Sequence, residues 1–221
     1  MTALADLIRP RRHSAATRYW EIDTLRGVAI VMMVIYHLMW DLWYFRVLPD
    51  VVLYEGFWKY FQRTIAVLFI GLVGVSLAVT TMRSAGPHGD RPVPFRPYLL
   101  RGLRIFGWGM VVSLVMWVAR VGYVHFGVLH LIGFSIIAAY PFLRLRWVNL
   151  ALWAAFQIAG HLLLSVRVDF PWLLWLGLTP VAYYPNDYFP LIPWFGVVLL
   201  GLFIGNTLYT PQGRVLVLPA I

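Results

Sequence analysis

Several apolar runs in the sequence approach or exceed the roughly 18 residues that a helix needs to cross a lipid bilayer. Apolar side chains make up 61% of the 221 residues and charged side chains only 12%, a balance too apolar for a soluble domain of this size. A backbone in lipid must satisfy its own hydrogen bonds, so these runs are expected to be helices. The sequence therefore predicts an all-α fold, a polytopic integral membrane helical bundle.

About six transmembrane helices are expected, joined mostly by short loops. Their predicted bounds are Leu25–Phe45, Thr64–Met82, Leu103–Ala119, Phe126–Leu143, Trp147–Val166 and Pro190–Leu208. The run PWLLWLGLTP, before the sixth span, is too short to cross and is predicted to be a short re-entrant or interfacial segment. The chain then divides into a basic tail (1–18), a transmembrane domain (19–208) and a C-terminal tail (209–221).

The 18 Lys and Arg residues are divided unevenly between the two ends of these spans. Thirteen lie on the side of the N-terminus, and the other five are Arg46, Lys59, Arg63, Arg120 and Arg167. Positive residues favour the cytoplasmic side, so both termini are predicted to be cytoplasmic, with the protein in the plasma (inner) membrane. Because the arginines lie at the ends of apolar runs, the net charge of +9 does not indicate a nucleic-acid partner. The chain has no cysteine, which excludes catalytic thiols and thiolate metal sites.

The first span carries three ionisable residues, Arg26, His37 and Asp41. On a helix Arg26 and His37 share a face and stand about 16 Å apart along the axis, and Asp41 follows His37 by one turn. An ionisable group in a span costs at least a few kcal/mol and normally has a function. The alternative, that a His37–Asp41 pair only ties helices together, stays open.

Other polar residues are predicted to gather near the two ends of the bundle. Arg101 and Arg104 join Arg26 on the cytoplasmic side, whereas His130, Asp187, Tyr188 and Trp194 lie toward the outer side with His37. Four of these residues have a structural alternative. Arg26 could be an anchor paired with Asp23, His130 a packing residue, Asp187 a cap of the sixth span and Trp194 part of the core. A metal site of His37, Asp41 and His130 would need helices to converge by chance, so no metal is expected.

Three stretches also resemble known families. The run EIDTLRGVAIVMMVIYH has the Arg-x10-His arrangement of the membrane acyltransferases called acyltransferase family three. The runs FGVLHLIGFSIIAAYP and DYFPLIPWFGVVLLGLFIG resemble the bacterial relatives of the heparan-alpha-glucosaminide N-acetyltransferase catalytic domain. The resemblance extends from about Trp20 to Asn206. It implies a transmembrane acyltransferase with His37 as its base and Arg26 in donor binding.

The sequence departs from the heparan-type pattern at two places. These enzymes carry their catalytic histidine in the loop after the first helix of the motif, near Leu48 here, and no histidine occupies that loop. The chemistry is therefore expected to follow the Arg-x10-His pattern, or the active site has been lost. The family usually continues into a further helix after residue 208, so a site residue contributed from there would be absent.

The favoured function is transfer of an acetyl or short acyl group from cytoplasmic acyl-CoA, with acetyl-CoA as the donor. The anionic donor would seek Arg26, Arg101 and Arg104, and its pantetheine arm would rise through the bundle to His37. His37 would deprotonate an acceptor or take the acyl group itself, and Asp41 would orient the imidazole. The resemblance implies a sugar amine or hydroxyl on an extracytoplasmic glycan or glycolipid as acceptor, with His130, Asp187, Tyr188 and Trp194 on its side.

Two other functions remain open. A proton-coupled transporter or flippase would use His37 and Asp41 as a proton relay, although no related halves are visible in the sequence. A non-catalytic membrane subunit would have mutually satisfied polar residues and no cavity. Membrane lipids are expected partners in every case. The oligomeric state stays open. The small residues Gly71, Gly74, Ser76 and Ala78 on the second span permit close helix packing, either within one chain or between two chains.

Overall fold

A computed structural model describes residues 19–86, 91–181, 183, 187–210 and 213–215. The predicted basic tail at 1–18 and most of the predicted C-terminal tail lie outside these residues. In the described part the chain forms six α-helices, one 3-10 helix and a two-stranded hairpin. This arrangement confirms the predicted all-α helical bundle. The elements are α1 (Trp20–Tyr44), α2 (Gly56–Ala85), α3 (Phe95–Val118), α4 (Val128–Ala138), η1 (Tyr140–Phe142), α5 (Arg146–Leu163), α6 (Leu191–Leu208), β1 (Tyr209–Thr210) and β2 (Gly213–Arg214).

Four of the described helices, α1, α2, α3 and α6, are long and apolar enough to cross a membrane. The predicted fourth span is shorter than expected: α4 has 11 residues and is followed by η1, which contains Pro141. Proline lacks the N–H that a continuing α-helix needs, which accounts for the change of helix type. At 1.5 Å per residue α4 rises only about 16 Å. The predicted number of six spans therefore stays a prediction.

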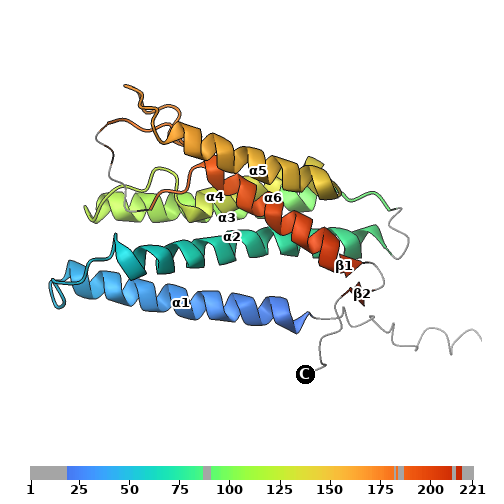
Figure 1. Ribbon diagram of the computed structural model, residues 1–221, viewed down its shortest axis with the longest axis horizontal. Helices are drawn as coiled ribbons and strands as arrows, with labels where there is room; N and C mark the ends of the chain where they lie inside the picture. The colour runs from blue at the N-terminus through green and yellow to red at the C-terminus, as the bar shows by residue number, and fades with distance from the viewer. Residues whose placement is uncertain (1–18, 87–90, 182, 184–186, 211–212, 216–221) are drawn as a thin grey trace, which may run out of the picture.

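The helices lie roughly antiparallel along one long axis (Figure 1). Helix α6 packs between α2 and α5, α3 packs against α4, and α1 packs chiefly on α2. One end of the bundle holds the starts of α1, α3 and α5 and the ends of α2 and α6; we call it the basic end. The opposite end holds the connections 45–55 and 119–127 and the described residues of the connection between α5 and α6, 164–181, 183 and 187–190; we call it the loop end.

Helices α2 and α6 are in direct backbone contact. A Cβ atom on Gly74 would overlap the carbonyl oxygen of Val198, and one on Gly201 would overlap the carbonyl oxygen of Gly71. Any residue larger than glycine would clash here. Small residues are typical of close crossings between membrane helices. The small-residue face predicted on the second span is therefore used within the chain, against α6.

Hydrogen bonds fasten the basic end. The amide of Asn206 at the end of α6 donates to the carbonyl oxygen of Leu143, at 3.0 Å, and so ties α6 to the turn before α5. The hairpin of β1 and β2 closes on the start of α1, where Tyr209 and Arg214 both donate to the carboxylate of Glu21, at 3.2 and 3.3 Å. The start of α1 is thus joined to the hairpin that follows α6.

The loop end is organised by the connection between α5 and α6. Its residues 171–180, predicted to be interfacial or re-entrant, form turns rather than a helix, and the N–H of Leu191 donates to the carbonyl oxygen of Trp175. Further along, Phe126 and Tyr188 form a parallel β-bridge, and the N–H of Phe189 donates to the carbonyl oxygen of Phe126 at 2.9 Å. This bridge places residue 187 beside the start of α4.

Candidate active site

A cavity of about 250 Å³ opens at the basic end between α1, α2 and α3. Three of its lining residues are arginines, Arg26, Arg83 and Arg101, and one is the acid Asp23. The structure therefore brings together Arg26 and Arg101, which were predicted as donor-binding residues. Three guanidinium groups around one small cavity form a site suited to phosphate oxygens. We call it the basic-end cavity.

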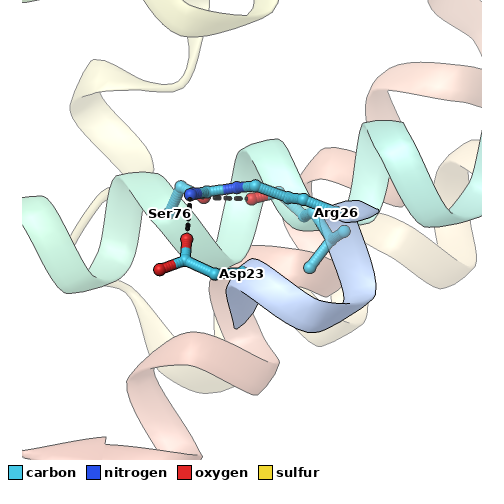
Figure 2. Close-up of polar contacts among 4 residues, drawn as sticks. Asp23, Arg26 and Ser76 are labelled. Carbon is cyan, nitrogen blue, oxygen red and sulfur yellow. Dashed lines mark hydrogen bonds and ion pairs between the residues drawn. The ribbon is translucent and has the colours of Figure 1, made fainter. Parts of the chain in front are cut away.

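Arg26 is held by two side chains (Figure 2). Its Nη1 donates to Oδ1 of Asp23 at 2.9 Å, and its Nη2 donates to Oγ of Ser76 at 2.5 Å. Ser76 lies on α2 and donates its own proton to the carbonyl oxygen of Leu72. The Asp23 pair is the alternative expected from the sequence, and the link to α2 is additional. Because the Arg26 side chain is 44% exposed, an anion can still reach the guanidinium.

The third predicted donor residue, Arg104, is not part of this cavity lining. It lies one turn after Arg101 on α3, with its side chain exposed. Arg83 takes its place: its guanidinium lies 5.3 Å from the centre of the Tyr19 ring. From the sequence Arg83 was only one of many positive residues at the end of a span, and no motif distinguished it.

His37 lies on an exposed face of α1. Its Nδ1 is 2.8 Å from the carbonyl oxygen of Met33, one turn earlier in the helix. A carbonyl oxygen can only accept, so Nδ1 carries the proton and donates it. In the neutral imidazole Nε2 then keeps its lone pair, which is the form that a general base requires.

Asp41 does not bond to His37. The Nδ1–H of His37 is donated to Met33, one turn earlier in the helix, instead. The Asp41 side chain is exposed and forms no hydrogen bond or ion pair with any described residue. The orienting bond predicted between these two residues is therefore not formed in the structure.

Asp187 is a half-buried carboxylate of this region. Its Oδ2 accepts the N–H of Val128 at 3.1 Å, in the first turn of α4, where the helix dipole favours a negative charge. It therefore caps α4, whereas the sequence suggested a cap of the sixth span. Burial raises the pKa of Asp187 above its usual range, and the Val128 bond and the nearby His37 act against this rise in pKa. Asp187 thus lies within electrostatic reach of His37.

His130 is 2% exposed and lies in the first turn of α4. Its Nδ1 accepts the N–H of Gly127 at 3.2 Å, so its neutral form carries the proton on Nε2. The ring lies between Phe106 and Phe126, with ring centres 5.0 and 5.8 Å away. Nε2 has no hydrogen-bond partner within the described part of the chain. A buried donor without a partner costs about 1–3 kcal/mol, which a bound water or a ligand oxygen would offset.

A larger cavity of about 740 Å³ lies at the loop end between α2, α5, α6 and the connection that precedes α6. We call it the loop-end cavity. The predicted acceptor residues Tyr188 and Trp194 line it. Tyr188 donates to the carbonyl oxygen of Leu174 at 2.7 Å, and burial raises its pKa. Burial also raises the pKa of Tyr183, another lining residue, to about 12, so both phenols are protonated near neutral pH.

Arg63, His161 and Arg167 also line the loop-end cavity, and sequence reasoning left them out of the site. Their positions at the ends of predicted spans suggested contact with lipid headgroups or the membrane interface. The signal that could have found them is their location on the side of the bundle with few positive charges. Among the described residues no cluster of three His, Asp or Glu is arranged to hold a metal ion.

A comparison with protein families identifies the family of the chain. The family model described as "Heparan-alpha-glucosaminide N-acetyltransferase, catalytic" matches residues 18–220. The chain belongs to this family. No curated protein and no solved structure matched the chain. The resemblance stated from the sequence is confirmed, and membership implies a membrane acetyltransferase.

In a member of the heparan-alpha-glucosaminide N-acetyltransferase family, the two groups of residues acquire a chemical meaning. Helix α2 lines both cavities, with Ser76 in the basic-end cavity and Arg63 in the loop-end cavity. These two residues stand about 20 Å apart along the helix axis. The two cavities therefore lie at opposite ends of one helix, and the loop-end cavity also holds the aromatic residues Tyr183, Tyr188, Phe189 and Trp194.

Proposed function

We propose that this acetyltransferase moves an acetyl group from cytoplasmic acetyl-CoA to a sugar amine or hydroxyl on an extracytoplasmic glycan or glycolipid. In this proposal the basic end and both termini face the cytoplasm of a cell whose plasma (inner) membrane holds the protein. The observation that carries the proposal is the separation of three arginines at one end from His37, His130 and Asp187 at the other.

The donor would bind with its phosphates at the basic-end cavity. Arg26 and Arg101 line that cavity with Arg83, and guanidinium groups bind phosphate through paired N–H donors. Ser76 holds the Arg26 guanidinium on α2, so less side-chain freedom is lost when an anion binds. Arg104, outside the lining, would contribute only to the positive field that attracts the donor.

His37 would act as the general base. Its Nε2 lone pair takes the proton of the acceptor amine or hydroxyl while the acceptor atom attacks the thioester carbonyl carbon. The tetrahedral intermediate then breaks the C–S bond, and the coenzyme A thiolate leaves and takes up the proton. The Met33 carbonyl oxygen holds Nδ1–H throughout, so the imidazole keeps the tautomer that this role requires.

His130 and Asp187 would assist from α4 and from the connection before α6. The Nε2–H of His130 is a donor without a partner in the described residues, and it is suited to the carbonyl oxygen that becomes negative during attack. Asp187 lies within electrostatic reach of His37 and stabilises the imidazolium that forms. Asp41, one turn along α1, would add a weaker, solvent-screened contribution.

The first experiment uses the purified protein in nanodiscs with radiolabelled acetyl-CoA. Wild type should hydrolyse or transfer the thioester, and His37→Ala should lower the rate by roughly 10²–10⁴-fold, the usual contribution of a general base. His37→Gln is the matched control for shape, since it retains hydrogen bonding and cannot take a proton. Equal thermal unfolding of the three proteins would show that the fold is intact. Full activity of His37→Ala would overturn the mechanism.

A further inference from the structure

The loop-end cavity carries positive charge without an acid. Its basic lining residues are Arg63 on α2, His161 on α5 and Arg167 after α5, and no Asp or Glu is among the described residues that line it. The basic-end cavity differs, because Asp23 lies there beside Arg26. A cavity with two guanidinium groups and no carboxylate attracts an anion.

The two guanidinium groups are not occupied by charged partners. The side chain of Arg63 forms no hydrogen bond or ion pair with any residue that the structure describes. Arg167 donates from Nη1 only to neutral oxygens, the Val166 carbonyl and the Thr179 hydroxyl, each at a long 3.3 Å. Most of the N–H donors of both side chains therefore remain available to a ligand.

The rest of the lining is mainly apolar and lies partly on membrane-spanning helices. Val67 is one turn deeper on α2 than Arg63, and Val197 is one turn deeper on α6 than Pro193. Trp194, Leu163 and Leu164 complete this apolar wall. A cavity that combines arginine side chains with an apolar wall fits a ligand that has an anionic head and an alkyl chain.

We propose that the loop-end cavity binds the phosphate group of the acceptor, and that this acceptor is a lipid-linked sugar phosphate. The apolar wall of the cavity would contact its lipid chain. This inference rests on the proposed function and specifies its acceptor class. One guanidinium group satisfies a planar carboxylate by a two-pronged contact, whereas a phosphate presents more oxygens and can engage arginines from two separate elements. The phosphate would hold the acceptor while its sugar reaches toward His37.

Binding is measured without acetyl-CoA, by isothermal titration calorimetry on the full chain in phosphatidylcholine nanodiscs, with protein-free nanodiscs as the blank. Four probes are compared: decyl phosphate, decanoate, decyl glucoside and inorganic phosphate. We expect decyl phosphate to bind about tenfold more tightly than decanoate or decyl glucoside, the equivalent of about 1.4 kcal/mol. Tighter binding of decyl phosphate than of inorganic phosphate assigns a lipid-linked acceptor; equal binding of the two assigns a soluble sugar phosphate and overturns the lipid link.

Single substitutions assign the binding to this cavity. Arg63→Gln and Arg167→Gln should each weaken decyl phosphate binding about tenfold, and Arg63→Lys should restore part of it. Arg120→Gln is the matched control, because Arg120 lies at the loop end of α3, beside a different cavity, and should leave binding unchanged. Equal binding of decyl phosphate and decanoate, or an equal loss in Arg120→Gln, would overturn the proposal.

The outcome is independent of catalysis. If acetyl transfer is absent and decyl phosphate still binds in an Arg63-dependent way, the proposed function fails while the anion site stands. If transfer to sugars occurs and the substitutions at Arg63 and Arg167 leave the KM for every acceptor unchanged, the anion site fails while the enzyme stands.

Discussion

The carboxylate of Asp187 accepts the backbone N–H of Val128 at 3.1 Å, and this bond joins the connection before α6 to the first turn of α4. The two residues are far apart in the sequence. Their contact places the half-buried Asp187 beside the first turn of α4, which holds His130, and within electrostatic reach of His37. The bond therefore determines which side chains of three separate segments can act together.

Gly127→Ala should disrupt this contact. A Cβ atom at residue 127 would overlap Oδ2 of Asp187, although the backbone there, with φ of −86°, accepts any residue. We expect a loss of about 1–3 kcal/mol in the free energy of unfolding, as for other overpacked sites, and a lower acetyl-transfer rate. Gly107→Ala on α3 is the control, because no atom lies within 4 Å of its added Cβ. Thermal unfolding in nanodiscs compares the two; an unchanged Gly127→Ala protein would contradict the overlap.

The pH dependence of stability should reveal Asp187. Burial raises its pKa from the ordinary value of 3.8, so the folded protein favours the protonated acid more than the unfolded chain does. The resulting stabilisation is complete below pH 3.8 and is lost as the pH rises through the raised pKa. Asp187→Asn cannot ionise, so its unfolding temperature should fall less than that of wild type from acid to neutral pH. Parallel curves for the two proteins would show that Asp187 does not have a raised pKa.

The basic-end arginines should control donor affinity. Arg26→Gln and Arg101→Gln should each raise the KM for acetyl-CoA about five- to tenfold and leave kcat nearly unchanged, because the phosphates are bound equally before and during the reaction. Arg104→Gln, outside the cavity lining, should have a smaller effect. Arg96→Gln on the same helix is the control for loss of one exposed positive charge. Steady-state kinetics at two salt concentrations measure the differences; an equal KM for all four variants would exclude a specific donor site.

The two acids should differ in their effect on turnover. Asp187→Asn should lower kcat about tenfold, since Asp187 is half-buried and within electrostatic reach of His37. Asp41→Asn should lower it less, because the exposed Asp41 side chain does not bond to His37. Neither substitution should change the KM for acetyl-CoA. A large loss of acetyl-CoA binding in Asp41→Asn would give Asp41 a different role.

The sequence predicted the helical class and the location of Arg26 and Arg101 at the same end of the bundle, because span ends and charge asymmetry restrict both. It also predicted the close packing of the second span through Gly74. These are properties of residue type and period, and they need no knowledge of long-range contacts.

The remaining features depend on contacts that no local pattern encodes. Asp41 follows His37 by one turn, yet the imidazole donates to the carbonyl oxygen of Met33 instead. Asp187 caps α4 because residues 126 and 188 pair as extended backbone, and this pairing joins distant segments. Arg167 enters a cavity only because the connection folds back onto α6.

The glycine contact between α2 and α6 restricts how such a protein can work. With Gly74 and Gly201 against backbone atoms, the two helices have no side-chain layer on which to slide. Alternating access by rocking would have to separate this seam, whereas an acetyl relay would leave it in place. Both cavities share α2, so their spacing is constant throughout a relay. Under the proposed function, only the small acyl group would then cross the membrane, and donor and acceptor would each remain on their own side.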